Sequence, residues 1–240
     1  MGGPIRGRRG IIRAKMSLGN TLKSSIGAKV LMAVTGILLT LFVIGHMLGN
    51  LQVFLGPDKL NQYAETLQNL GPLLWVIRIG LLVILLLHIY AALKVVKMSK
   101  AARPVDYQQR KDLATRFAAR TMLASGLLLV IFIVYHILHF TVGAVDLAGS
   151  TGFETEDGHK DVYSMVVVGF QHMPTTAIYI LGMLILCLHL SHGVSSLMQT
   201  LGLRKASNAS TIDKIGPAFS IFIFIGNVSM PLAAITGIIS

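Results

Sequence analysis

Five apolar segments, each long enough to cross a lipid bilayer, constrain this chain more than any other feature of its sequence. A transmembrane helix needs about 20 consecutive, mostly apolar residues. Inside a bilayer the backbone must satisfy its own polar groups, so each segment is expected to be helical. The segments span approximately residues 27–54, 73–96, 121–142, 175–197 and 217–238. The sequence therefore predicts an all-α integral membrane bundle of five transmembrane helices.

Composition supports a membrane protein. Charged residues make up 13% of the chain and hydrophobic residues 53%, whereas soluble domains carry about 25% charged residues. So few charges cannot cover a globular surface, and lipid is expected to contact much of the protein. We divide the chain into a basic cytoplasmic tail at residues 1–16 and a membrane domain at residues 17–240.

The basic residues are divided unequally between the two ends of the predicted bundle. All of the 21 Lys and Arg residues except Lys59, Arg78 and Lys160 lie in the N-terminal tail, at the start of the first segment, or around the second-to-third and fourth-to-fifth connections. Lys and Arg accumulate on the cytoplasmic side of membrane proteins, so the N-terminus is predicted to be cytoplasmic. The net charge of +11 is thereby explained by topology, and we expect no binding of nucleic acid.

The single cysteine, Cys187, lies in an apolar segment. One cysteine cannot form a disulfide framework within the chain or a cysteine-based metal site. Covalent attachment of a c-type haem is excluded as well, because the sequence has no Cys-x-x-Cys-His motif.

Histidines recur inside the apolar segments, where ionisable residues are costly and usually functional. One such histidine could simply be a polar residue bonded between helices, but four of the five segments contain one. A helix rises about 1.5 Å per residue, which places His46 and His136 about 25 and 24 Å from the basic end. The same count places His88 and His189 about 13 and 16 Å from that end. The four histidines therefore form two layers.

Two histidines at one depth on different helices are what an iron with an imidazole on each side of a porphyrin requires. The two layers predict two b-type haems, an outer one and an inner one. Depth does not choose between His136 and His139, or between His189 and His192, because residues three apart share a helix face. The member of each pair that is not a ligand could bond a haem propionate or a quinone oxygen.

Three other classes of membrane protein compete with this hypothesis. A transporter with a histidine proton relay would often contain internal repeats, and we recognise no repeat in the sequence. A di-haem cytochrome of another complex, such as a hydrogenase or formate dehydrogenase, would have similar haem sites. A membrane anchor without haem does not explain histidines at matched depths.

Four motifs, in order, resemble those of a known family. They are LFVIGHMLGNLQ at 41–52, LLHIYAALK at 86–94, YHILHFT at 135–141 and LHLSHG at 188–193. Together they resemble the cytochrome b subunit of succinate dehydrogenase and fumarate reductase, in its single-polypeptide, five-helix, di-haem form. The resemblance runs from about residue 17 to the C-terminus.

The resemblance implies the ligands and the partners. It implies axial ligands at His46, His88, His136 and His189, with His189 preferred over His192. It also implies an iron–sulfur subunit on the cytoplasmic face, which binds a flavoprotein that oxidises succinate or reduces fumarate. The expected cofactors are two haem b and a quinone, with menaquinone favoured over ubiquinone. The expected location is a bacterial-type inner membrane, crossed several times.

Further residues receive weaker predictions. Lys29, Arg116 and Arg120 could pair with propionates or with an acidic face of the iron–sulfur subunit, although membrane topology alone explains basic residues there. Glu65 follows the first segment on the outer side and could accept a proton from quinol, although an acidic loop residue needs no such explanation. The direction of catalysis is not encoded in these motifs.

Overall fold

The structure is a computed structural model that describes residues 24–101 and 121–240. The basic tail at 1–16 and the predicted site residues Arg116 and Arg120 lie outside the described residues.

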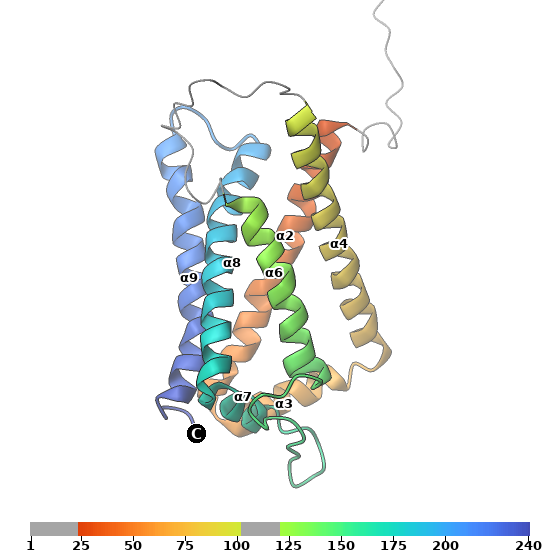
Figure 1. Cartoon of the computed structure of the whole chain (residues 1–240), viewed down its shortest axis with the longest axis vertical. Coiled ribbons are helices and arrows are strands. Elements are labelled where there is room, and N and C mark those ends of the chain that lie inside the picture. The colour runs from red at the N-terminus through yellow and green to blue at the C-terminus, as the bar shows by residue number, and fades with distance from the viewer. Residues whose placement is uncertain (1–23, 102–120) are drawn as a thin grey trace, which may run out of the picture.

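Within this part of the chain, five helices are long and apolar enough to cross a membrane. They are α2 (Ser25–Asn50), α4 (Pro72–Ala101), α6 (Met122–His136), α8 (Met173–Thr200) and α9 (Ala209–Ile235). The 3-10 helix η1 (Leu51–Leu55) extends α2, and the π-helix η2 (Ile137–Val142) extends α6. The predicted all-α membrane bundle is confirmed (Figure 1).

The fifth helix begins earlier than predicted. Proline at position 217 was expected to mark its start, but α9 begins at Ala209 and contains Pro217 and Pro231 in its interior. Proline is tolerated inside transmembrane helices because neighbouring groups satisfy the freed backbone carbonyls.

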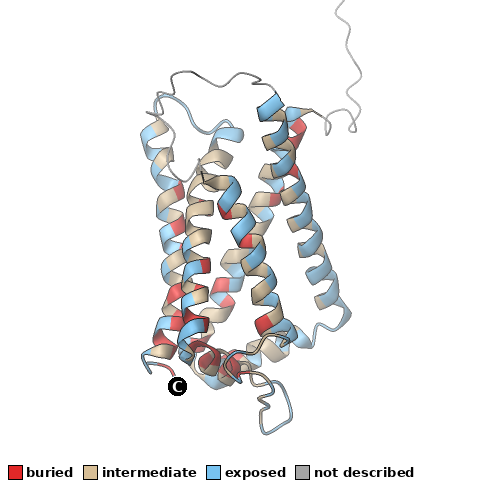
Figure 2. Cartoon of the chain, in the orientation of Figure 1, coloured by how far each residue is buried: buried red, intermediate tan, exposed pale blue. Residues whose placement is uncertain are grey.

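The long helices pack unequally. α8 lies against α9 and α6, whereas α4 packs against α2 (Figure 1). Ala91 is the only residue of α4 that is buried, and most of that helix is exposed (Figure 2). Its exposed side chains are largely Leu, Ile and Val, which suits contact with lipid.

Two short helices, α3 (Pro57–Gln68) and α7 (Val162–Gln171), lie across one end of the bundle (Figure 1). We call this the capped end and the opposite one the open end. Residues 143–174 lie between the third and fourth predicted spans, and α7 is part of this connection. Asp161 caps the start of the helix, and its side chain accepts a hydrogen bond from the Ser164 amide. Its buried Tyr163, Val167 and Phe170 belong to the largest core cluster.

Candidate functional site

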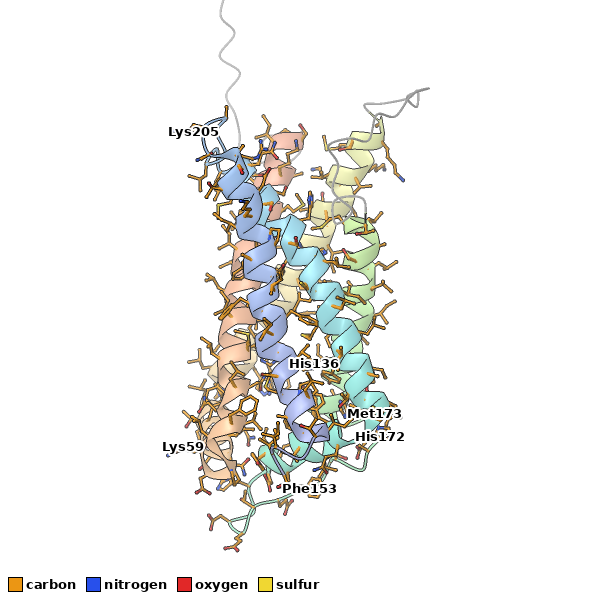
Figure 3. The ribbon with its side chains drawn as sticks, turned by 90° about the vertical axis from the view of Figure 1, so that its left-hand side faces the viewer. Lys59, His136, Phe153, His172, Met173 and Lys205 are labelled. Atoms are coloured by element: carbon orange, nitrogen blue, oxygen red, sulfur yellow. The ribbon has the colours of Figure 1, made fainter. Side chains whose placement is uncertain are left out.

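The structure brings four transmembrane histidines together in two pairs. The rings of His46 on α2 and His136 at the end of α6 have centroids 5.7 Å apart. Those of His88 on α4 and His189 on α8 are 6.5 Å apart. Figure 3 shows His136 inside the bundle, nearer the capped end. These are the pairs that helix depth predicted, and iron ligation by them stays a prediction.

The separation within each pair fits one metal ion between two imidazoles. A transition metal binds an imidazole nitrogen at about 2 Å, so two imidazoles on opposite sides of one iron have ring centres about 6 Å apart. No group of three or more His, Cys, Asp or Glu among the described residues could hold a metal ion. Two protein ligands suffice for a haem, because the porphyrin supplies the others.

The hydrogen bond to His88 determines which of its nitrogens is free. The Thr35 hydroxyl on α2 donates to the Leu31 carbonyl at 2.7 Å and lies 3.1 Å from His88 Nδ1. Because the hydroxyl hydrogen is already used, Thr35 accepts a hydrogen bond from Nδ1–H of His88. A neutral imidazole carries one hydrogen, so Nε2 has a free lone pair, as a metal ligand requires.

Ser125 on α6 makes the same kind of hydrogen bond with His189. Its hydroxyl donates to the Met122 carbonyl at 3.0 Å and lies 3.2 Å from His189 Nδ1. By the same argument Nδ1 of His189 carries the hydrogen and Nε2 is free. Both histidines of this pair are therefore held in the tautomer that can bind iron.

Glycines next to these hydroxyl residues let the imidazoles approach the neighbouring helix. A Cβ atom at Gly36 would lie 3.4 Å from Cε1 of His88, and one at Gly126 would lie 3.3 Å from Cε1 of His189. A Cβ atom at Gly36 would already touch the His88 ring, and one at Gly126 would require the His189 ring to shift by a few tenths of an ångström. Each ring of this pair is thus positioned by a hydroxyl residue and the glycine that follows it.

The two halves of the site are a sequence repeat that our sequence analysis missed. Residues 35–46 read TGILLTLFVIGH and residues 125–136 read SGLLLVIFIVYH, and VILLLH at 83–88 corresponds to LILCLH at 184–189. Unequal connections hide the repeat, because the two histidines of the first half are 42 positions apart and those of the second half are 53 positions apart. The repeat is the signal that could have identified Thr35 and Ser125.

The pair nearer the capped end has different hydrogen-bond partners. Asn50 Nδ2 lies 3.1 Å from His46 Nε2, so the amide donates and this nitrogen also has a lone pair. The Tyr179 hydroxyl lies 3.2 Å from His136 Nδ1 and 3.0 Å from His139 Nδ1. His139 sits in the π-helix η2, a rare geometry that is frequent at functional sites, and it is fully buried.

The weaker site predictions fall on the periphery. Lys29 lines a shallow pocket between α2 and α4 near the open end. Glu65, on α3 at the capped end, has its carboxylate 3.8 Å from His159 Nε2, and both side chains are about half exposed. His192 lies three residues beyond His189 toward the open end and is partly buried. At the start of α8, His172 contacts the Thr175 hydroxyl at 3.0 Å, in keeping with a helix-end role.

Comparisons of the chain with protein-family models, curated proteins and solved structures find no significant match.

Proposed function

We propose that this chain is the membrane cytochrome b subunit of a succinate:quinone oxidoreductase, of the succinate dehydrogenase and fumarate reductase type. The observation that carries the proposal is the arrangement of four histidines from four helices as two facing pairs at two depths. For His88 and His189 the hydrogen bond to Nδ1 leaves Nε2 with a free lone pair, which is the state that an axial ligand needs. The Asn50 amide donates to Nε2 of His46, so that nitrogen carries no hydrogen, and the bond from Asn50 would give way to the iron.

In this proposal His46 and His136 hold the haem nearer the capped end, and His88 and His189 hold the haem nearer the open end. When bound, the two haems supply one-electron transfer across the bilayer. The chain fixes the direction of each imidazole before the cofactor binds, because the donors and acceptors around the rings belong to packed helices.

The repeat supports His136 rather than His139, and His189 rather than His192. His136 occupies the position equivalent to His46, and both close a twelve-residue stretch that begins with a hydroxyl residue and glycine. His189 is equivalent to His88, and Ser125 bonds to it as Thr35 does to His88. A pseudo-two-fold relation would thus pair equivalent residues around each iron.

The proposed partner subunits are inferred from the basic residues at the open end and from the four sequence motifs. With the open end in the cytoplasm, its lysines would face an iron–sulfur subunit, which binds the flavoprotein that carries the succinate or fumarate site. Lys29 and its neighbours on α4 suit an acidic partner surface. At the capped end, Glu65 is the candidate proton acceptor for a quinol, with menaquinone favoured, in a bacterial-type inner membrane.

A proton-coupled transporter is the competing hypothesis. The repeat found in α2 and α6 is a feature that many transporters also have, so the lack of a repeat no longer argues against this class. Transporters usually place one site near the midplane of the membrane. The two histidine pairs at separate levels favour the cytochrome.

The test is haem content. The full chain is produced in cells that make haem, purified in detergent, and measured by a reduced-minus-oxidised spectrum and pyridine-haem quantitation. We expect two b haems per chain, and the loss of one in each of His46→Ala and His88→Ala. The control His159→Ala changes an exposed loop histidine and should retain both. A wild-type chain without haem would overturn the proposal.

A further inference from the structure

One phenol contacts two histidines at the capped end. The Tyr179 hydroxyl lies within hydrogen-bonding distance of Nδ1 of His136 and Nδ1 of His139, at 3.2 and 3.0 Å. Tyr179 and His139 are buried, with exposed fractions of 6% and 0%. Water therefore has little access to Tyr179 and His139.

The two contacts use the hydrogen of Tyr179 only when the two histidines adopt opposite tautomers. If both Nδ1–H groups donated to the phenol oxygen, its own buried hydrogen would find no other acceptor among the hydrogen bonds of the described residues. A phenol has one hydrogen to donate, and a neutral imidazole has one N–H and one bare nitrogen. When Tyr179 accepts a bond from one Nδ1–H, it can donate its own hydrogen only to a bare Nδ1 on the other ring. One histidine therefore has a free Nε2, and the other carries its hydrogen on Nε2.

We infer that Tyr179 is a positioning residue. It leaves His136 able to bind the iron and prevents His139 from binding it. The inference rests on the proposed function, in which His136 faces His46 across a haem iron. Nδ1–H of His136 then donates to Tyr179, and Tyr179 donates to Nδ1 of His139. The hydrogen of His139 is thereby placed on Nε2, which can no longer bind a metal.

This assignment has a cost at His139. Its Nε2 atom is buried and has no hydrogen-bond partner among the described residues. His139 packs instead against Phe140, with ring centroids 4.1 Å apart, and against Tyr135. A buried N–H without an acceptor is costly, and the hydrogen bond from Tyr179 helps to offset this cost.

The repeat shows why such a residue is needed in only one half of the protein. The position of α2 equivalent to His139 is Gly49, and the position of α4 equivalent to Tyr179 is Arg78. The first half offers only His46 at this level, so no choice between ligands arises. Tyr179 occurs in the half that presents two histidines three residues apart.

The inference is tested with Tyr179→Phe, which removes the hydroxyl and keeps the ring. The control is Tyr135→Phe, which removes a hydroxyl from the same cluster that bonds to neither imidazole. In haem-loaded protein, EPR reports the axial ligands of each low-spin haem. We expect Tyr179→Phe to give a second signal for the haem near the capped end, and the double variant with His139→Ala to restore a single signal. Tyr135→Phe should resemble the wild type.

A second measurement needs no haem and no variant. NMR of haem-free wild-type protein labelled in histidine distinguishes a ring N–H from a bare nitrogen, and we expect opposite tautomers with the hydrogen on Nδ1 of His136. Three results would overturn the role of Tyr179 while leaving the haem proposal intact. They are the same tautomer in both histidines, a hydrogen on Nε2 of His136 and Nδ1 of His139, or an unchanged single EPR signal in Tyr179→Phe. A wild-type chain that binds no haem would instead refute the proposed function, and the NMR result would still decide the tautomers.

Discussion

The Thr35 hydroxyl lies 3.1 Å from Nδ1 of His88, across the contact between α2 and α4 and 53 positions away in sequence. Its own hydrogen is donated to the Leu31 carbonyl, so the hydroxyl can only accept from the imidazole. The relationship recurs between Ser125 and His189. Two hydroxyls thus set the orientation of both rings in one histidine pair.

Thr35→Val should weaken this pair without disturbing the fold, because valine matches the shape of threonine and removes only the hydroxyl. Loss of a hydrogen-bond partner to a metal-bound histidine typically costs about 10- to 100-fold in affinity. We expect faster loss of one haem from Thr35→Val, measured as haem transfer to an excess of apomyoglobin. The control is Thr40→Val on the same helix, since the Thr40 hydroxyl bonds to the Gly36 carbonyl and to no histidine. Equal rates in the two variants would contradict the role of Thr35.

The spans and the pairing by depth followed from the sequence, because both depend on hydropathy and on the rise of a helix. The contacts of Thr35 and Ser125 did not, since they depend on how each helix is rotated about its axis. The π-helix at Ile137–Val142 was also missed, because apolar composition does not distinguish one helical hydrogen-bond register from another. It places His139 in a fully buried position beside Tyr179.

Helix α7 was missed for a different reason. Its sequence, VYSMVVVGFQ, is too short to cross a membrane and follows an acidic stretch, so it lies outside the five predicted spans. Packing against α3, α8 and α9 stabilises it, and such tertiary contacts cannot be read from local composition.

Gly216 should not tolerate a side chain. A Cβ atom there would collide with the Ser191 carbonyl oxygen and the Ser195 hydroxyl, and a backbone carbonyl cannot move away as a side chain can. Forcing extra volume into a packed contact costs about 1–3 kcal/mol. We expect Gly216→Ala to lower the thermal unfolding midpoint in detergent. Gly45→Ala is the control, because nothing lies within 4 Å of a Cβ atom at Gly45, and its midpoint should not fall.

Acid should release the loop held by Asp146. Its carboxylate accepts hydrogen bonds from the amides and hydroxyls of Ser150 and Thr151, at 2.7 to 3.1 Å. These bonds, that of the Thr151 hydroxyl foremost, hold the pKa of Asp146 well below its ordinary value of 3.8. A lowered pKa in the folded state means that the contribution to stability is fully present above the ordinary value and declines as pH falls below it.

Hydrogen–deuterium exchange of the Ser150 and Thr151 amides measures this dependence. Wild-type protection, corrected for intrinsic exchange rates, should hold from neutral pH to about pH 4 and fall below it. Asp146→Asn removes the charge and should give weaker protection at neutral pH with little further change on acidification. Asp157→Asn alters an exposed residue of the same loop and should behave as the wild type. Equal protection in Asp146→Asn and wild type would exclude this role for the carboxylate.

The cap itself depends on Asn61, which joins α3 to the start of α7. Its side-chain amide donates to Asp161 Oδ1 at 2.9 Å and accepts from the Tyr163 amide at 2.9 Å. Asn61→Ala breaks both bonds and leaves two partly buried groups without this partner, at a cost of about 1–3 kcal/mol. We expect limited proteolysis to cut near residues 158–162 sooner than in the wild type. Gln68→Ala, an exposed change on the same helix, is the control. If the two variants were cut at the same rate, the cap would be held by the apolar contacts of α7 alone.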